Sequence, residues 1–271
     1  MIPLFDSLTH PMPDGSWLHP RYDGINTFAT VLAEMAEAGV SRALAVALGS
    51  GTVGYHPDTY ANLVKAASDG AGTDVELYPV AYAPVGDEDF MKDLPKHLDS
   101  FKAGGYIAVK IHPRISDVDL DAEPIRHVMQ AAASVGLPVL LCCYFYGGGA
   151  KACKNSVASL QRLLPDVPNT SIVLLHAGVF RCLEVAELAR HHANVLVDLS
   201  YTLCKYPGAS LDLDLAYLFR HFDQRICVGS DHPEFSMLNL RERFEQFSDG
   251  LDVERKERIA YKNLLNFLGL S

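Results

Sequence analysis

Apolar, β-branched runs alternate along the chain with segments whose apolar residues recur at helical spacing. Eight of these runs are expected to be strands: residues 3–10, 41–48, 76–81, 107–112, 138–143, 171–176, 195–200 and 225–229. Strands that alternate with helices in this way are typical of βαβ units around a parallel sheet. The pattern therefore predicts an α/β protein.

Glycine marks the ends of the predicted helices. Residues 26–38 place Phe28, Val31 and Met35 on one apolar stripe, and Gly39 follows where helices commonly end in the left-handed conformation. Glycine also precedes the fourth and fifth predicted strands. This regular alternation of helix ends and strand starts favours a closed (β/α)8 TIM barrel over an open sheet.

Residues 1–271 are expected to form a single barrel domain. The length of 271 residues fits this fold, which typically takes roughly 250 residues. No internal repeat, low-complexity tract or linker marks a second domain. Two extra helical segments, 238–247 and 253–268, follow the eighth strand and are expected to close the bottom or side of the barrel.

The composition narrows the class of partner. A net charge of −10 and the lack of a Lys/Arg cluster argue against a nucleic acid, so a small-molecule substrate is expected. No leader is recognised and no apolar run reaches the ~18 residues that span a bilayer, which predicts a cytoplasmic protein without membrane association. The six cysteines are expected to be reduced thiols, and a homo-oligomer is compatible with the sequence.

Residues with reactive side chains stand at the carboxyl ends of several predicted strands. They are His10, His112, Cys142, His176 and Asp231. Because the carboxyl ends of barrel strands converge on one pocket, these side chains are expected to form a site. The irregular stretches 11–24, 49–57, 144–150 and 202–210 all follow strands and would surround it.

Six short motifs lie at residues 5–10, 109–113, 137–142, 173–178, 229–233 and 259–265. Together they resemble the amidohydrolase superfamily of metal-dependent hydrolases, in particular the branch with aminocarboxymuconate-semialdehyde decarboxylase and lactonases. The resemblance implies a metal held by two first-strand histidines, a fifth-strand histidine and the final aspartate, with the sixth-strand histidine assisting catalysis. Here Leu8 and Cys142 replace two of these ligands.

Two alternatives follow for the metal. A cysteine thiolate is a good zinc ligand, so His10, Cys142 and Asp231 could hold a zinc ion, with His176 completing the tetrahedron. Alternatively, the divalent metal has been lost and Cys142 is a small packing residue in a repurposed pocket.

The predicted reaction is hydrolysis of a C–O or C–N bond in an ester, lactone or amide. Asp231 would activate the water, and His176 would stabilise the oxyanion or protonate the leaving group. Without metal, general base catalysis suits an activated ester or lactone better than an amide. A third route uses Cys142 or Cys143 as a nucleophile, which requires a lowered thiol pKa. A decarboxylase or lyase, and a non-catalytic barrel that binds a small ligand, remain alternatives.

Four further residues are predicted to contact the substrate. Strand alternation places Lys110 on the same face as His112, so its side chain points into the barrel, where it either binds substrate or neutralises a buried aspartate. His112 either binds a substrate carboxylate or caps its strand. Tyr144 belongs to an aromatic stretch that could exclude water, and His232 follows Asp231 at the pocket rim.

Overall fold

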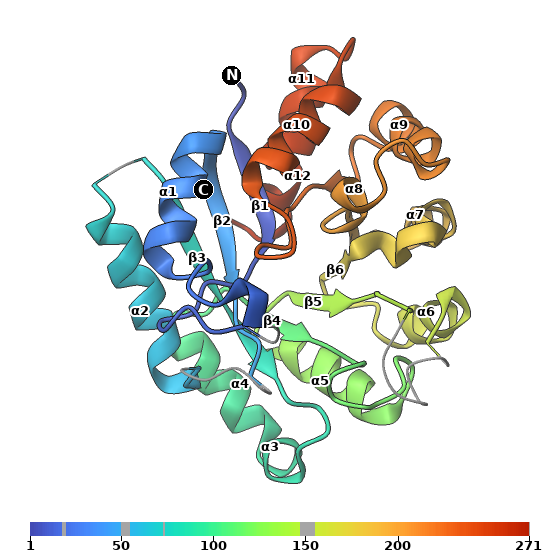
Figure 1. The fold of residues 1–271 in the computed structure, drawn as a ribbon. Coiled ribbons are helices and arrows are strands. Elements are labelled where there is room, and N and C mark those ends of the chain that lie inside the picture. The colour runs from blue at the N-terminus through green and yellow to red at the C-terminus, as the bar shows by residue number, and fades with distance from the viewer. Residues whose placement is uncertain (18–19, 50–54, 73, 147–154, 271) are drawn as a thin grey trace.

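Eight parallel strands form one sheet in the computed structural model, which describes residues 1–17, 20–49, 55–72, 74–146 and 155–270. The strands are β1 (Leu4–Thr9), β2 (Val40–Val46), β3 (Glu76–Ala83), β4 (Ala108–Ile111), β5 (Val139–Cys142), β6 (Ile172–Leu175), β7 (Val195–Asp198) and β8 (Ile226–Cys227). Each strand pairs with the next in sequence, and the helices surround them (Figure 1). The predicted (β/α)8 TIM barrel is confirmed.

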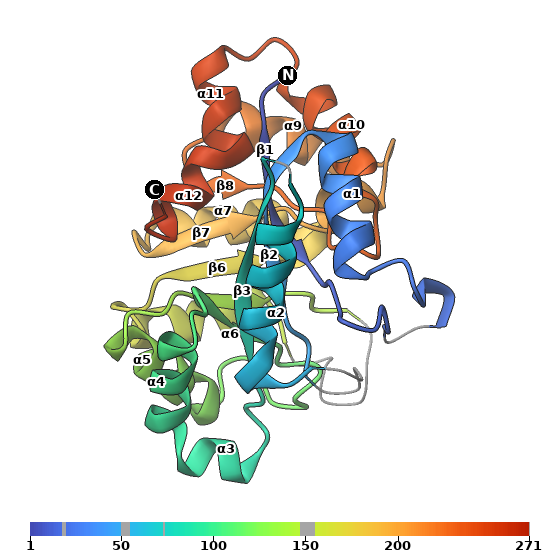
Figure 2. The ribbon, with the colours of Figure 1, turned by 90° about the vertical axis from the view of Figure 1, so that its left-hand side faces the viewer.

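The helices lie between the strands and around the outside of the sheet, as the side view also shows (Figure 2). The α-helices are α1 (Phe28–Ala38), α2 (Pro57–Gly70), α3 (Glu88–Lys92), α4 (Leu94–Ala103), α5 (Glu123–Ser134), α6 (Val157–Leu163), α7 (Cys182–Arg190), α8 (Thr202–Lys205), α9 (Leu211–His221), α10 (Met237–Ser248), α11 (Val253–Glu257) and α12 (Asn263–Phe267). Among the residues described, none of these helices combines the length and apolar character that crossing a bilayer requires.

The barrel closes along a seam between β1 and the segment that contains β8. The Ser7 amide donates to the carbonyl of Val228 at 3.0 Å, and the Asp231 amide donates to the carbonyl of Leu8 at 2.9 Å. β8 itself has only two residues, fewer than the expected 225–229, because the chain leaves the regular strand conformation before Asp231, whose φ is +61°. The seam therefore fixes Asp231 against β1.

The side chains inside the barrel form an apolar cluster separate from the larger core between strands and helices. Its buried members include Phe5, Leu8, Leu44, Val80, Ala108, Leu140, Val173 and Leu196. They come from alternate positions of successive strands, as strand geometry requires. Leu8 is fully buried among them, so the residue at this motif position serves packing.

Besides β8, residues 202–210 and the last predicted helix differ from the expected elements. Residues 202–210 were expected to be irregular, but α8 occupies their first four positions. The last predicted helix, 253–268, is divided by a π-helical turn at Arg258–Lys262. At this turn the Arg258 guanidinium contacts Asp223, and the Asn263 amide donates to two backbone carbonyls of the β8 region. These anchors explain the departure from regular helix geometry.

The glycine-rich stretches at 50–54 and 147–149 lie outside the described residues.

Gly229 is expected to be intolerant of a side chain because of the seam. A Cβ placed there would come within 2.9 Å of the Asp6 carboxylate and would also contact Ser7. Gly229→Ala should therefore lower the free energy of unfolding by about 3 kcal/mol, measured by urea denaturation. Gly70→Ala, where nothing lies within 4 Å of the added methyl group, is the matched control. Equal stability of the two variants would contradict the prediction.

Candidate active site

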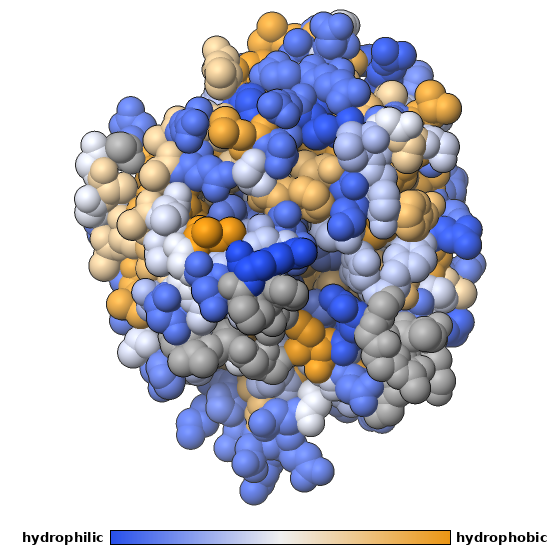
Figure 3. All heavy atoms as spheres, viewed as in Figure 1, coloured by the Kyte–Doolittle hydropathy of each residue, from blue (hydrophilic) through white to orange (hydrophobic). Residues whose placement is uncertain are grey.

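A pocket of about 260 Å³ lies at the carboxyl ends of the strands. It is lined by His10, Trp17, Leu48, Lys110, His112, Arg114, Ile115, Tyr144, His176, Tyr201, Asp231 and Glu234. Six of the eight residues predicted to form the site are therefore brought together here. Cys142 and His232 are not among the residues that line it. The space-filling view shows polar side chains over much of one face of the molecule (Figure 3).

His10 presents one ring nitrogen to the pocket. Its Nδ1 lies 2.7 Å from the carbonyl of Val46, so Nδ1 carries the proton and Nε2 keeps a free lone pair. Nε2 lies 3.4 Å from Lys110 Nζ and 3.5 Å from Asp231 Oδ1. Burial and the nearby Lys110 lower the pKa of His10 to about 4, so the ring is neutral at neutral pH.

Asp231 is the carboxylate that reaches the pocket. Its left-handed backbone conformation, φ +61°, is unusual for a residue with a side chain and turns the chain sharply at the seam. The side chain is 14% exposed. Burial opposes ionisation, but His176 and His10 lower the pKa of Asp231 below its usual value. Asp231 is therefore a carboxylate at neutral pH.

His176 begins the turn after β6 and also has a positive φ, +65°. Its Nδ1 lies 3.2 Å from the carbonyl of Ser200, which leaves the other ring nitrogen for the pocket. Burial opposes protonation, but the neighbouring Cys142 and Asp231 raise the pKa of His176 to about 9. The ring is therefore an imidazolium at neutral pH, close to a carboxylate.

Cys142 ends β5 and is 4% exposed. Its sulfur is within hydrogen-bonding reach of His112 and His176. Burial disfavours a thiolate, but the charge of these histidines lowers the pKa of Cys142 well below its usual value. The lowered pKa required by the nucleophile hypothesis is present, whereas burial raises the pKa of Cys143.

Lys110 points into the barrel as strand alternation predicts, and it is 2% exposed. Burial lowers its pKa, while Cys142 and Asp231 favour the charged form. The amine lies in the pocket wall beside His10 and near Asp231. This position is compatible with both expected roles, substrate binding and neutralisation of a buried aspartate.

Asp198, at the end of β7, holds the backbone of His176 and Ser200 in place. It was not among the residues predicted from the sequence. Its Oδ1 accepts hydrogen bonds from the amides of His176 and Ser200, each at 3.1 Å. The Ser7 and Ser200 hydroxyls also donate to this carboxylate. The sequence signal for this role was an aspartate within the apolar predicted strand 195–200, because a carboxylate in such a run is expected to be buried and to need hydrogen-bond partners.

Arg114 and Tyr201 were also missed. Arg114 follows β4 closely, lies over the Tyr144 ring at 5.1 Å, and its buried Nε has no hydrogen-bond partner among the described residues. Tyr201 has a φ of +63°, so it shares the positive φ of His176 and Asp231. Residues in such conformations cluster at functional sites, which supports this pocket as the functional one.

His232 was predicted to contact substrate, but it does not line the pocket. Its Nε2 lies 3.1 Å from Glu34 Oε2 on α1, and the side chain is 5% exposed. Its carbonyl accepts from the His10 amide at 3.0 Å. The structure thus places His232 in the seam between β1 and the final segment, because the turn at Asp231 sends the next side chain outward.

The four candidate metal ligands do not come together as a coordination set. Within the described residues, which include all four, no group of three His, Cys, Asp or Glu side chains is arranged to hold a metal ion. Leu8 supplies no donor, Cys142 is engaged by two histidines, and the free lone pair of His10 faces the amine of Lys110. With the Lys110 amine in this place, these donors do not fit a divalent ion.

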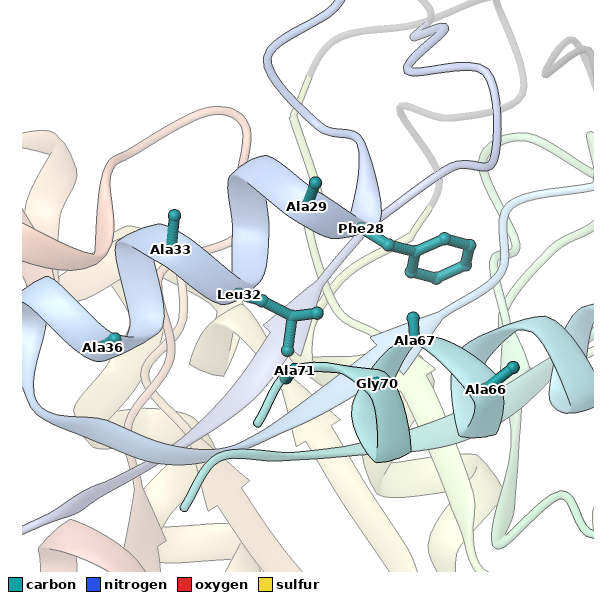
Figure 4. Close-up of a pocket in the computed structure, with 9 residues that line it drawn as sticks. All are labelled: Phe28, Ala29, Leu32, Ala33, Ala36, Ala66, Ala67, Gly70 and Ala71. Atoms are coloured by element: carbon teal, nitrogen blue, oxygen red, sulfur yellow. The ribbon is translucent and has the colours of Figure 1, made fainter. Parts of the chain in front are cut away.

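A larger cavity lies elsewhere and has no chemistry of this kind. It is a groove of about 530 Å³ between α1 and α2, lined by Phe28, Ala29, Leu32, Ala33, Ala36, Ala66, Ala67, Gly70 and Ala71 (Figure 4). Size alone therefore does not locate the functional site, since this groove has no ionisable side chain in its wall.

The fold and pocket define a (β/α)8 barrel with a polar site at its strand ends. A family model described as amidohydrolase matches residues 6–270. The chain belongs to the amidohydrolase family. A comparison with curated proteins gives no match.

Solved structures with this fold include both hydrolases and decarboxylases. An uncharacterized TIM-barrel protein from Bordetella bronchiseptica is 19% identical with a TM-score of 0.75, covering 98% of both chains. A probable 2-pyrone-4,6-dicarboxylic acid hydrolase from Acinetobacter baumannii, with citric acid bound, is 16% identical with a TM-score of 0.65, covering 98% of this chain and 99% of that one. A 5-carboxyvanillate decarboxylase from Novosphingobium aromaticivorans, complexed with manganese and 4-hydroxy-3-methoxy-5-nitrobenzoic acid, is 12% identical with a TM-score of 0.63, covering 99% and 96%. At these identities the likeness shows the fold alone.

Proposed function

We propose that this protein is a hydrolase that cleaves the C–O bond of a small ester or lactone. The observation that carries the proposal is that the Asp231 carboxylate and the His176 imidazolium line the same pocket. A base and an acid whose pKa values are pushed apart by their surroundings are suited to general acid–base catalysis.

In the proposed reaction, Asp231 takes a proton from a water molecule while the water oxygen attacks the substrate carbonyl carbon. His176 then donates its proton to the leaving oxygen as the C–O bond breaks. Esters and lactones suit this chemistry better than amides, because their leaving oxygen needs less activation than an amide nitrogen. The pocket volume of about 260 Å³ favours a small substrate.

The charges around the pocket favour a substrate that carries a carboxylate. Arg114 offers a buried Nε without a hydrogen-bond partner in the described part of the chain, and an arginine fork matches a carboxylate. His112 lines the same wall. The similar structure of a probable 2-pyrone-4,6-dicarboxylic acid hydrolase, which has citric acid bound, supports this choice, because both small molecules carry carboxylates.

Turnover in ¹⁸O-labelled water tests the reaction class. A panel of small lactones and esters, each with and without a carboxylate group, is incubated with the protein, and the products are measured by mass spectrometry. We expect one ¹⁸O atom in the product acid and faster turnover of the carboxylate-bearing members. Release of carbon dioxide without ¹⁸O in the remaining product would instead assign a decarboxylase.

The proposed role of His176 as the general acid predicts how the rate depends on pH. His176 is protonated below its pKa of about 9, and Asp231 is ionised down to below its ordinary pKa. We expect kcat/KM to be level between roughly pH 6 and 8 and to fall about tenfold per unit above about 9, as the acid loses its proton. His176→Gln should remove this alkaline decline together with most of the activity. A wild-type rate that rises through pH 9 would contradict the assignment.

A further inference from the structure

The amine of Lys110 faces the ring lone pair that His10 presents to the pocket. His10 Nδ1 donates to the Val46 carbonyl at 2.7 Å, so Nε2 is the acceptor atom of the ring. Lys110 Nζ lies 3.4 Å from this Nε2. A lone pair that accepts a hydrogen bond from an amine is not available to a metal ion. The Lys110 ammonium group and a divalent metal ion would therefore compete for His10 Nε2.

We infer that Lys110 is the resident cation of this pocket and excludes a divalent metal ion from His10, Cys142 and Asp231. The lysine side chain rises from β4 inside the barrel, is 2% exposed and lines the pocket beside His10. A divalent ion near His10 would therefore remain close to a like charge in a buried site.

The surroundings of Lys110 provide acidic groups to balance a single positive charge. Burial lowers the pKa of Lys110, and Cys142, Asp231 and Asp198 counteract this by favouring the charged form, while Arg114 and His176 supply other cationic groups nearby. A lysine in place of the ion also removes the need for the ligands that this chain lacks. The fully buried Leu8, which packs with the interior core, is compatible with a lysine but contributes nothing to a metal.

This assignment gives the lysine a part in the reaction, which rests on the proposed function. An ammonium group has three N–H donors and can stabilise the oxyanion that forms when water attacks a carbonyl. The electrostatic stabilisation of the transition state would then come from the chain itself.

Metal binding by the full-length protein tests the inference without any substrate. The chain is purified without added metal, treated with chelator and titrated with Co²⁺ and Zn²⁺, and bound metal is measured by elemental analysis after gel filtration. We expect the wild type to retain less than about a tenth of a mole of metal per chain. About one mole of Co²⁺ per chain, with a thiolate absorption band that Cys142→Ser abolishes, would overturn the inference.

Lys110→Met tests the competition directly, because methionine keeps most of the side-chain length and removes the charge. We expect this variant to bind Co²⁺ at least about tenfold more tightly than the wild type. Lys96→Met, on the exposed surface of α4, is the matched control and should behave as the wild type does. Equal Co²⁺ affinity in the folded Lys110 and Lys96 variants would refute the inference. Circular dichroism checks folding, and if Lys110→Met does not fold, Lys110→Gln takes its place in the same Co²⁺ titration, with the same outcomes deciding the inference.

Discussion

Asp231→Asn should lower kcat/KM by about a thousandfold on the best ester or lactone substrate. The amide cannot take a proton from water, and loss of a positioned general base typically costs about 10²–10⁴-fold in rate. Because asparagine has nearly the same shape, the backbone hydrogen bond from residue 231 to the Leu8 carbonyl should persist. Steady-state kinetics measures the effect, and thermal denaturation should show a folded variant.

The matched control is Asp69→Asn, which makes the same change on the exposed surface of α2. Its kcat/KM should be that of the wild type. If Asp231→Asn keeps activity within about threefold of this control, another group provides the base and the proposed mechanism is wrong.

Asp198→Ala should lower the free energy of unfolding by about 3–5 kcal/mol. The substitution leaves the buried amides of His176 and Ser200 and two hydroxyl groups without their acceptor, and each unsatisfied buried group costs about 1–3 kcal/mol before relaxation. The midpoint of thermal unfolding should fall by roughly 10 °C. Activity should fall as well, because Ser200 positions the His176 ring.

Asp198→Asn separates the acceptor role from the charge. Its side-chain oxygen can still accept from the two amides, and the Ser7 hydroxyl can accept from its NH₂ group. We therefore expect less than about half of the stability loss of the alanine variant. If asparagine and alanine destabilise equally, the hydrogen bonds to the two amides are not what this residue contributes.

The sequence was sufficient to predict the barrel. Runs such as residues 138–143 are apolar throughout, because a barrel strand is buried on both faces, and this property is legible without a structure. The end of the first helix at Gly39 could also be predicted from the sequence, and the φ of +66° at this glycine confirms the left-handed conformation. The short β8 and the π-helical turn at Arg258–Lys262 were not, since both depend on contacts with distant segments.

The candidate site could be predicted as a set of residues but not as a geometry. Strand-end position was enough to bring His10, His176 and Asp231 into one pocket. It could not show that Lys110 faces the His10 lone pair, because that contact depends on the length and direction of a side chain from another strand. The outward turn of His232 likewise follows from the local backbone at Asp231, which residue types alone do not determine.

The seam between β1 and the final segment sets the order in which the site can form during folding. The Asp231 amide bonds to Leu8 and the Asp6 carboxylate accepts from the Ser230 amide at 2.9 Å, so residues more than 220 positions apart must meet before the proposed base is in place. Contacts of such long range form late, because the intervening chain must be ordered first. A nascent chain that has completed six or seven strands therefore lacks Asp231 in its working position, and activity appears only when the last strand joins the first.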